Sequence, residues 1–257
     1  MTPHYSLNSS EIKVWYVRPE DFTDPALLEV FVSWFSDAER TVLNNFRQEK
    51  HRHTYLVAHA LLRGALSHAT GHPPTLWQFS TNAYNKPFIA QPHLSEALQF
   101  NLSHTDGLAV VCVTRIGVIG IDVERINQNA ATSELAPEIL SPEEYLDYVH
   151  QPEAEKQNRL LRYWTLKEAY IKATGLGLSA GLKTYAFDLD VGPQPKIRFL
   201  NETRPDMLSD CPSNWKFWQI CLQSGHILAV GSYETSSLER SISIEQAAWL
   251  EENHALR

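Results

Sequence analysis

The segment GVIGIDVERI, residues 117–126, begins like a buried strand and then places two carboxylates side by side. Its first residues are apolar and β-branched, which is typical of a strand inside a core. Asp122 and Glu124 follow two positions apart, and side chains at that spacing point to the same face of a strand. Two carboxylates on one face repel each other. The pattern therefore indicates either a solvated strand end next to Arg125 or a bound divalent cation.

A third acidic position comes from WTLKEAYIKATGLGLS, residues 164–179. Trp164, Glu168 and Lys172 recur every four residues and so share one face of a predicted helix. A structural alternative is an ion pair between Glu168 and Lys172 beside a core tryptophan, worth only about 0.2–0.5 kcal/mol. The same spacing allows Glu168 to join the acidic group and Lys172 to stand beside a phosphate.

Ser103 and His104 in FNLSHTDG, residues 100–107, suggest a hydrolase at first sight. Neighbouring residues on a strand point to opposite faces, and the chain has no G-x-S-x-G elbow. A hydroxyl and an imidazole at a strand end can instead hold a phosphate group. The sequence therefore disfavours a catalytic triad here.

Basic residues in two other segments could have an ordinary surface role instead. Lys86 lies in the loop sequence YNKPFI next to a stiff proline, and Arg52 and His53 lie in a basic helix start. The glycine-rich run at 175–179 lacks the lysine and the spacing of a P-loop, so an ATP site is not indicated.

The composition indicates a globular protein of one large domain or two ordinary ones. The chain has 257 residues, of which 43% are hydrophobic and 20% charged. A net charge of -8 argues against a nucleic-acid binder. Three scattered cysteines give neither a disulfide framework nor a zinc-binding spacing. There is no signal-like start and no apolar run of membrane-spanning length, so we expect no membrane partner and a cytoplasmic location.

The order of the predicted elements favours an α+β fold in which helices pack on small antiparallel sheets, as two similar halves. A polar segment at about 127–137 separates them, which predicts halves at 1–125 and 126–257. The predicted strands lie at 12–17, 76–80, 99–103, 108–114, 117–124, 184–190, 215–222 and 226–233, and the predicted helices begin near 37 and 142 or span 48–69 and 153–174, with a short terminal helix from 243.

The four chemical segments, taken in order, resemble one known family. YNKP, FNLSHT, GIDVER and WTLKEAYIKATGLGLS are similar to the motifs of 4′-phosphopantetheinyl transferases of the surfactin-synthetase-activating type. That family has a G-[IV]-D-x-E strand and a [FW]-[ST]-x-K-E-[AS]-x-x-K helix, which residues 120–124 and 164–172 match. Matching segments run from about residue 47 to 180, and the chain length suits the pseudo-dimeric class.

The resemblance implies a reaction and a fold. The fold is a pseudo-dimer of two similar α+β halves with coenzyme A in the cleft between them. The enzyme moves the 4′-phosphopantetheine arm from coenzyme A onto a serine of an apo carrier protein, depends on Mg²⁺ and releases 3′,5′-adenosine diphosphate.

The resemblance also implies the metal-binding and catalytic residues. Asp122, Glu124 and Glu168 are expected to hold Mg²⁺ on the pyrophosphate, with water able to replace one of them. Lys172 is expected near the phosphates and the leaving group. Glu168 is the expected base for the serine proton, either directly or through a water.

The contacts to coenzyme A are expected mainly from the N-terminal half. Ser103, His104 and Lys86 are implied to hold the 3′-phosphate region. Family members also carry an arginine in the helix near position 54. Arg52 or His53 could take that place, and Arg52 is our assignment.

The resemblance implies that the acceptor is an acyl carrier protein, or a carrier domain of a fatty acid, polyketide or nonribosomal peptide synthase. The C-terminal half is expected to face it, and the single pseudo-dimeric chain is expected to be a monomer. Carrier proteins are usually acidic, so docking on this acidic chain needs a local basic or apolar patch. Arg47, Lys50 and Arg52, or residues 175–182, could supply it.

Two alternatives use the same residues differently. A Mg²⁺-dependent phosphoester enzyme, such as a nucleotide hydrolase, would need the carboxylates but no protein acceptor. A non-catalytic module that binds coenzyme A or a carrier protein would need no acidic cluster. The chain retains all the acidic positions, which counts against the second alternative.

Overall fold

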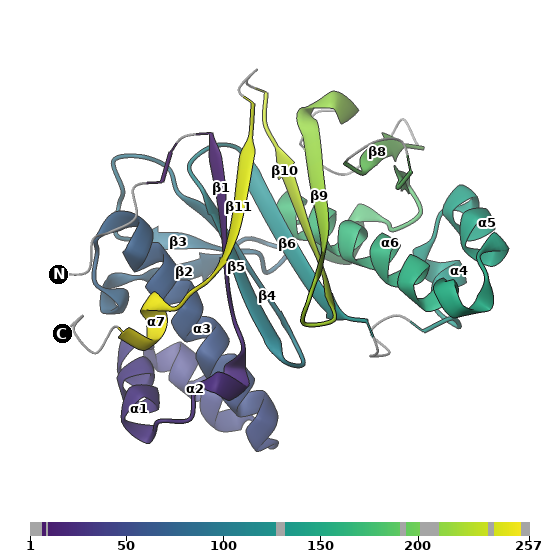
Figure 1. Cartoon of the computed structure of the whole chain (residues 1–257). Coiled ribbons are helices and arrows are strands. Elements are labelled where there is room, and N and C mark those ends of the chain that lie inside the picture. The colour runs from purple at the N-terminus through teal and green to yellow at the C-terminus, as the bar shows by residue number, and fades with distance from the viewer. Residues whose placement is uncertain are drawn as a thin grey trace. The chain divides into compact units, whose positions relative to one another are not determined.

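A computed structural model describes residues 7–8, 10–126, 132–190, 194–200, 211–235 and 239–252. The polar segment expected at 127–137 lies partly outside these described residues. The chain forms two compact units, one made of 1–81, 87–116 and 237–257 and the other of 82–86 and 117–236. Both units combine helices with small sheets (Figure 1).

The first unit is built on a four-stranded sheet in the order β11-β1-β5-β4. Strand β1 pairs antiparallel with β5 and parallel with β11, and β4 pairs antiparallel with β5. Its elements are β1 (Glu11–Val17), α1 (Pro25–Trp34), α2 (Asp37–Asn45), α3 (Glu49–Thr70), the hairpin β2 (Gln78–Thr81) and β3 (Pro87–Gln91), β4 (Gln99–Thr105), β5 (Leu108–Thr114), β11 (Ser241–Gln246) and α7 (Trp249–Glu252), with 3-10 turns at Pro19–Asp21 and Pro74–Leu76.

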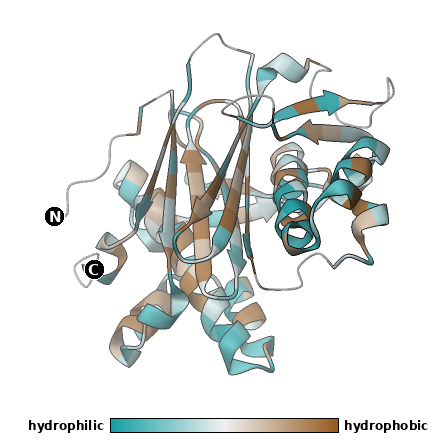
Figure 2. Ribbon diagram, turned by 45° about the vertical axis from the view of Figure 1, so that its right-hand side comes forward, coloured by the Kyte–Doolittle hydropathy of each residue, from teal (hydrophilic) through white to brown (hydrophobic). Residues whose placement is uncertain are grey.

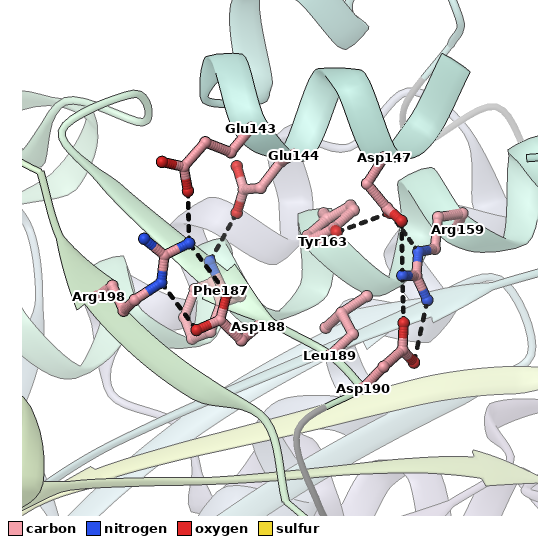
Figure 3. A pocket seen from close by; sticks show the side chains of 10 residues that line it. All are labelled: Glu143, Glu144, Asp147, Arg159, Tyr163, Phe187, Asp188, Leu189, Asp190 and Arg198. Atoms are coloured by element: carbon pink, nitrogen blue, oxygen red, sulfur yellow. Dashed lines mark hydrogen bonds and ion pairs between the residues drawn. The ribbon is translucent and has the colours of Figure 1, made fainter. Parts of the chain in front are cut away.

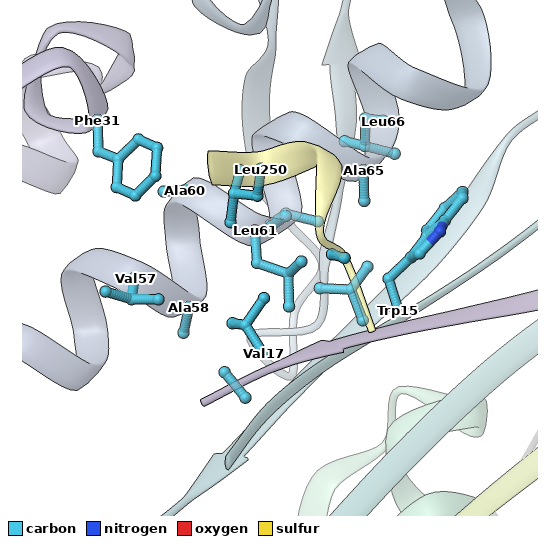
Figure 4. Close-up of a cluster of buried hydrophobic side chains, with 14 of the residues drawn as sticks. Trp15, Val17, Phe31, Val57, Ala58, Ala60, Leu61, Ala65, Leu66 and Leu250 are labelled. Carbon is cyan, nitrogen blue, oxygen red and sulfur yellow. The ribbon is translucent and has the colours of Figure 1, made fainter. Parts of the chain in front are cut away.

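The core of this unit joins the two ends of the chain to helix α3. Trp15 and Val17 from β1, Leu61 from α3 and Leu250 from α7 are all almost completely buried in one cluster (Figure 4). Burying a large apolar side chain stabilises the fold by about 1.5–3 kcal/mol. The first unit therefore depends on residues from both chain ends.

The second unit is built on a three-stranded antiparallel sheet in the order β6-β10-β9, against which helix α6 packs. Its elements are β6 (Val118–Arg125), α4 (Ala136–Ile139), α5 (Pro142–His150), α6 (Glu153–Thr174), the hairpin β7 (Tyr185–Asp188) and β8 (Lys196–Phe199), β9 (Trp215–Leu222) and β10 (His226–Tyr233), with 3-10 turns at Gly177–Ala180 and Pro212–Asn214. The helices in Figure 2 mix hydrophilic and hydrophobic residues, as helices with one face on a core do.

The two units repeat one order of elements. Each begins with a strand, followed by helices of which the last is 22 residues long. A two-stranded hairpin and two antiparallel strands come after that helix. The sheet order is the same in both, β1-β5-β4 in one and β6-β10-β9 in the other. Both long helices end in a left-handed glycine, Gly71 and Gly175. The predicted α+β fold of two similar halves is confirmed.

A buried cation recurs at the same place in both repeats, first in α3. Arg63 lies in α3 and pairs with Glu39, which forms a capping box with Ser36 at the start of α2. The guanidinium also donates to the carbonyls of Pro74 (2.8 Å) and Trp77 (3.0 Å) just after the helix.

In the second unit Lys167 of α6 takes the same role. Its ammonium lies 2.8 Å from Glu144, which forms a capping box with Ser141 at the start of α5. It also donates to the carbonyls of Leu182 (2.6 Å) and Tyr185 (3.1 Å). In each repeat one buried cation therefore ties the long helix to the preceding helix and to the segment that follows.

The boundary between the units differs from the predicted halves at 1–125 and 126–257. The structure divides the chain after Ile116, because β6 pairs with β10 and not with the strands that precede it. Both acidic motifs therefore belong to the second unit. The last segment returns to the first unit because β11 pairs with β1.

Some local predictions are wrong. Residues 241–246 form a strand where a terminal helix was expected from 243, because SISIEQ alternates and pairs with β1. The strand expected at 76–80 is shifted to Gln78–Thr81 behind a 3-10 turn. Helix α1 was not predicted, although Asp24 caps it and Pro25 starts it. Among the described residues, no helix is both long and apolar enough to cross a membrane.

Candidate active site

Strand β6 and helix α6 approach closely at Gly120. A Cβ atom at this position would lie 2.1 Å from the carbonyl oxygen of Ala169 and 2.4 Å from the nitrogen of Ala173. Both are backbone atoms, so no side chain can move away to make room. Glycine is therefore required here, and its absence of a side chain brings the carboxylates of β6 onto the helix.

Asp122 and Lys172 form the first contact across this interface. The ammonium of Lys172 lies 2.6 Å from Oδ1 of Asp122, which is buried at 4% exposure. Asp122 stands opposite Ala229 in the neighbouring strand β10. A buried carboxylate needs a charged partner, and Lys172 supplies it.

Glu124 and Trp164 form the second contact. The indole N–H of Trp164 donates to Oε1 of Glu124 at 3.1 Å. Trp164 and Lys172 thus lie beside Glu124 and Asp122, so the helix face that the sequence predicts is the one that meets β6. Lys172 pairs across the two elements with Asp122, and the alternative of a simple Glu168–Lys172 surface pair does not account for it.

Glu168 lies between those two positions on the helix, and its environment changes its acidity. Burial raises the pKa of Glu168 to about 7, helped by the charge of Asp122 and of Glu124 and opposed by Lys172. A carboxyl group with a pKa near neutrality can accept a proton and later release it under ordinary conditions.

The oxygen-only donor set fits a hard cation such as Mg²⁺, which proteins often bind through one or two carboxylates while phosphate and water complete its ligands. In the part of the chain that the structure describes, no group of three or more His, Cys, Asp or Glu side chains is close enough to hold a metal by itself. The carboxylate oxygens of Asp122, Glu124 and Glu168 are the donor type that Mg²⁺ prefers, and a metal held there would need phosphate and water as further ligands.

Lys86, predicted at the 3′-phosphate, lies in the second unit with these residues. Its ammonium donates to the carbonyls of Ala173 at 2.7 Å and of Ile119 at 3.3 Å. Both acceptors are backbone atoms of α6 and β6. The side chain is therefore engaged with the elements that carry the carboxylates.

The other predicted contacts to coenzyme A lie in the first unit. Ser103 is buried and His104 exposed on strand β4, as expected for neighbours on a strand. Arg52 pairs with Glu49 at 3.1 Å, and His53 contacts the carbonyl of Pro19 at 2.8 Å through Nε2. Arg52 and His53 both line a pocket of about 330 Å³ between α1 and α3. Both side chains are of intermediate exposure.

A second polar pocket of about 210 Å³ lies between α5, α6 and the β7–β8 hairpin (Figure 3). Arg159 binds Asp147 and Asp190, and Arg198 binds Asp188 and Glu143. Each guanidinium already has two carboxylate partners. The charged residues that line this pocket therefore form an ion-pair network that holds the hairpin to the helices. None of the predicted site residues lines it.

Two contributions to the site were not predicted from the sequence. The hydrogen bond from Trp164 to Glu124 joins residues 40 positions apart, and Asn82 donates to the carbonyl of Gly175 at 2.9 Å. The shared helix face of Trp164 and Glu168 was a usable signal for the first. No pattern in the sequence links Asn82 to a backbone carbonyl.

The comparison with known proteins agrees with these motifs. Residues 23–115 match the family model "4′-phosphopantetheinyl transferase, N-terminal" and residues 118–231 match "4′-phosphopantetheinyl transferase superfamily". The 4′-phosphopantetheinyl transferase HetI of Nostoc sp. is 33% identical over 69% of this chain and 74% of its own length. The transferase Sfp of Bacillus subtilis is 31% identical over 71% of this chain and 77% of its own length.

A solved holo-[acyl-carrier-protein] synthase from Neisseria meningitidis covers 46% of this chain and 98% of its own, at 18% identity and a TM-score of 0.36. That structural likeness is weak, whereas the sequence matches cover most of both units. The chain belongs to the 4′-phosphopantetheinyl transferase superfamily and is a transferase.

Proposed function

We propose that the chain transfers the 4′-phosphopantetheine arm of coenzyme A to a serine of an apo carrier protein, in a Mg²⁺-dependent reaction that releases 3′,5′-adenosine diphosphate. The observation that carries the proposal is the cluster at the β6–α6 contact. There Lys172 lies 2.6 Å from Asp122, next to Glu168 with its raised pKa of about 7. Family membership supports the same reaction.

The proposed chemistry is a displacement at phosphorus. The serine oxygen bonds to the phosphorus that carries pantetheine, while the bond from that phosphorus to the bridging oxygen breaks. The serine proton goes to Glu168, either directly or through a water. Lys172 stabilises the charge that grows on the departing phosphate.

Magnesium, held by Asp122, Glu124 and Glu168, would neutralise the pyrophosphate and stabilise its leaving group. Trp164 orients the Glu124 carboxylate through its indole N–H, 3.1 Å away. Such a partner behind a metal ligand fixes the direction of its oxygens.

In the first unit, Ser103, His104 and Arg52 are the proposed contacts to the 3′-phosphate region of coenzyme A. The Arg52 side chain is 42% exposed near the start of α3, and His104 is exposed near the end of β4. The acceptor is an acyl carrier protein or a carrier domain of a fatty acid, polyketide or nonribosomal peptide synthase, and the enzyme acts as a monomer.

Intact-protein mass spectrometry tests the proposal. Apo carrier proteins of each class are incubated with the chain, coenzyme A and Mg²⁺, and a gain of one phosphopantetheine arm is expected that disappears with EDTA. The released nucleotide, identified by chromatography, is expected to be 3′,5′-adenosine diphosphate. Free phosphate without a modified carrier would indicate a hydrolase instead.

The variant Glu168→Gln tests the proposed base. It removes the proton acceptor and is expected to abolish transfer while coenzyme A binding, measured by calorimetry, is largely retained. Glu155→Gln, an exposed position in the first turn of the same helix, is the matched control and is expected to remain active. Full activity of Glu168→Gln would exclude Glu168 as the base.

A further inference from the structure

The segment Asn82–Lys86 forms a preorganised turn in the second unit, although its neighbours in sequence belong to the first. The Asn82 side-chain oxygen accepts from the backbone N–H groups of Tyr84 and Lys86, both at 2.9 Å. The backbone N–H of Asn82 donates to the carbonyl of Lys86 at 3.0 Å, and Asn85 has a positive φ of 66°. Asparagine tolerates that conformation better than most residues.

Two side chains of this turn reach the carboxyl end of helix α6. Asn82 Nδ2 donates to the carbonyl of Gly175 at 2.9 Å, and Lys86 Nζ donates to the carbonyl of Ala173 at 2.7 Å. The last carbonyls of a helix have no partner within the helix. A lysine at this end is also favoured by the helix dipole. The turn thus caps the helix that carries Glu168 and Lys172.

Gly175 shows how closely the turn approaches. It ends α6 in a left-handed conformation with φ of 69°, and its N–H bonds to the carbonyl of Ile171. A Cβ atom at Gly175 would lie 2.8 Å from Cδ of Lys86 and 2.9 Å from Nδ2 of Asn82. The glycine is needed both for the backbone conformation and for the contact with these two side chains.

Lys86 also joins the helix to the strand. The same ammonium that bonds to Ala173 lies 3.3 Å from the carbonyl of Ile119 in β6. Ala173 directly follows Lys172, and Ile119 lies three residues before Asp122. One side chain therefore connects the strand and the helix whose relative position sets the Asp122–Lys172 contact.

We propose that Asn82 and Lys86 form a clamp that fixes the end of α6 against β6, and that Lys86 is a positioning residue for Lys172 and the carboxylates. This differs from the 3′-phosphate contact that the family motif predicts for Lys86. The catalytic part of the proposal rests on the proposed function, whereas the structural part does not.

The variant Lys86→Met removes the ammonium and keeps much of the apolar stem. The last turn of α6 is expected to loosen and Lys172 to lose its position. A misplacement of about 1 Å can reduce a rate by about a hundredfold, so kcat is expected to fall by about tenfold to a hundredfold with little change in KM for coenzyme A. Lys86→Arg, which keeps a cation, is expected to recover part of the rate, and Lys196→Met, at an exposed position of β8, is the control.

Comparison of coenzyme A with 3′-dephospho-coenzyme A separates the two roles of Lys86. A positioning residue affects both substrates equally, so the ratio of their kcat/KM values is expected to stay as in the wild type. If Lys86 instead binds the 3′-phosphate, Lys86→Met will raise KM for coenzyme A but not for the 3′-dephospho form. The kcat/KM ratio of coenzyme A to the dephospho form will then fall, which would overturn the proposal.

Hydrogen–deuterium exchange tests the clamp without any substrate. Lys86→Met and Asn82→Ala are expected to increase exchange of the amides at 171–175, while Lys196→Met leaves them unchanged. Unchanged protection in both clamp variants would overturn the proposal even if transfer is lost. If both clamp variants show increased exchange but the wild type transfers nothing to any carrier, the clamp is supported and the proposed function is contradicted.

Discussion

At the scale of single residues, the acidity of Glu168 links the site to the stability of the protein. Burial and the charges of Asp122 and Glu124 raise its pKa from 4.5 to about 7. The folded state therefore holds this proton more tightly than the unfolded chain does. The resulting stabilisation is fully present below pH 4.5 and is lost as the pH rises through about 7.

We expect Glu168→Gln to remove this pH dependence. Each unit of pKa shift corresponds to about 1.36 kcal/mol, so between pH 5 and pH 8 the wild type should lose about 2.5 kcal/mol relative to the variant. The measurement is urea unfolding at both pH values in EDTA, which keeps cations out of the site. Parallel curves for wild type and variant would contradict the assigned environment, and Glu155→Gln should follow the wild type.

The residues of this site differ in how far the sequence could predict them. Asp122 and Glu168 follow from local periodicity, because the two-residue spacing of a strand and the four-residue spacing of a helix place side chains on one face. The raised pKa of Glu168 depends on burial, which no local pattern gives. Lys86 was recognised as a motif residue, but its acceptors are backbone carbonyls of Ile119 and Ala173, and backbone carbonyls have no sequence signature.

At the scale of elements, the contacts of Lys167, the motif lysine next to Glu168, hold secondary-structure elements together. Lys167 is completely buried and bonds to Glu144 and to two backbone carbonyls, and Arg63 makes the equivalent contacts in the first unit. Because the first unit carries none of the acidic site, this repeated arrangement serves the packing of the helices. Lys167 is therefore a residue of the fold and not of the reaction.

Lys167→Met is expected to destabilise the protein by about 3–5 kcal/mol, because it leaves Glu144 buried without its charged partner. Lys167→Arg should reduce the free energy of unfolding much less, since Arg63 makes the equivalent contacts in the first unit. Urea unfolding of the two variants checks this, with Lys196→Met as an exposed lysine control. Equal stability of Lys167→Met and wild type would show that the buried pair is dispensable.

The elements with strong local signals were predicted best. Helix α6 spans Glu153–Thr174 as expected, and β9 and β10 have the predicted bounds, because glycine stops and apolar runs mark them. Strands β3 and β8 have only five and four residues and were not predicted. Strand β11 was mistaken for a helix because its partner, β1, lies at the opposite end of the chain.

At the scale of the whole molecule, the first unit is assembled from both ends of the chain. Strand β11 pairs in parallel with β1, and Glu245 accepts from the indole of Trp15 at 2.9 Å and pairs with Lys13 at 2.8 Å. Leu250 is completely buried in the same core. Among the described residues of the C-terminal segment, the one strand, β11, pairs in the sheet of the first unit.

Removal of residues 237–257 is therefore expected to unfold the first unit selectively. Hydrogen–deuterium exchange should show lost protection in β1, β5 and α3 and retained protection in β10 and α6. Leu250→Ala is a milder version and should cost about 2–5 kcal/mol. Loss of protection in both units to the same extent would show that they fold as one cooperative body.

The two helix-ending glycines also allow the repeats to be aligned, which has an evolutionary consequence. Counting back from Gly71 and Gly175, Gly64 occupies the position of Glu168. A Cβ atom at Gly64 would lie 2.9 Å from side-chain atoms of both Trp249 and Leu250. If the halves descend from one duplicated ancestor, an acid restored at position 64 would have to displace two apolar side chains. The return of the C-terminal segment to this core would therefore oppose recovery of an acidic residue in the first half.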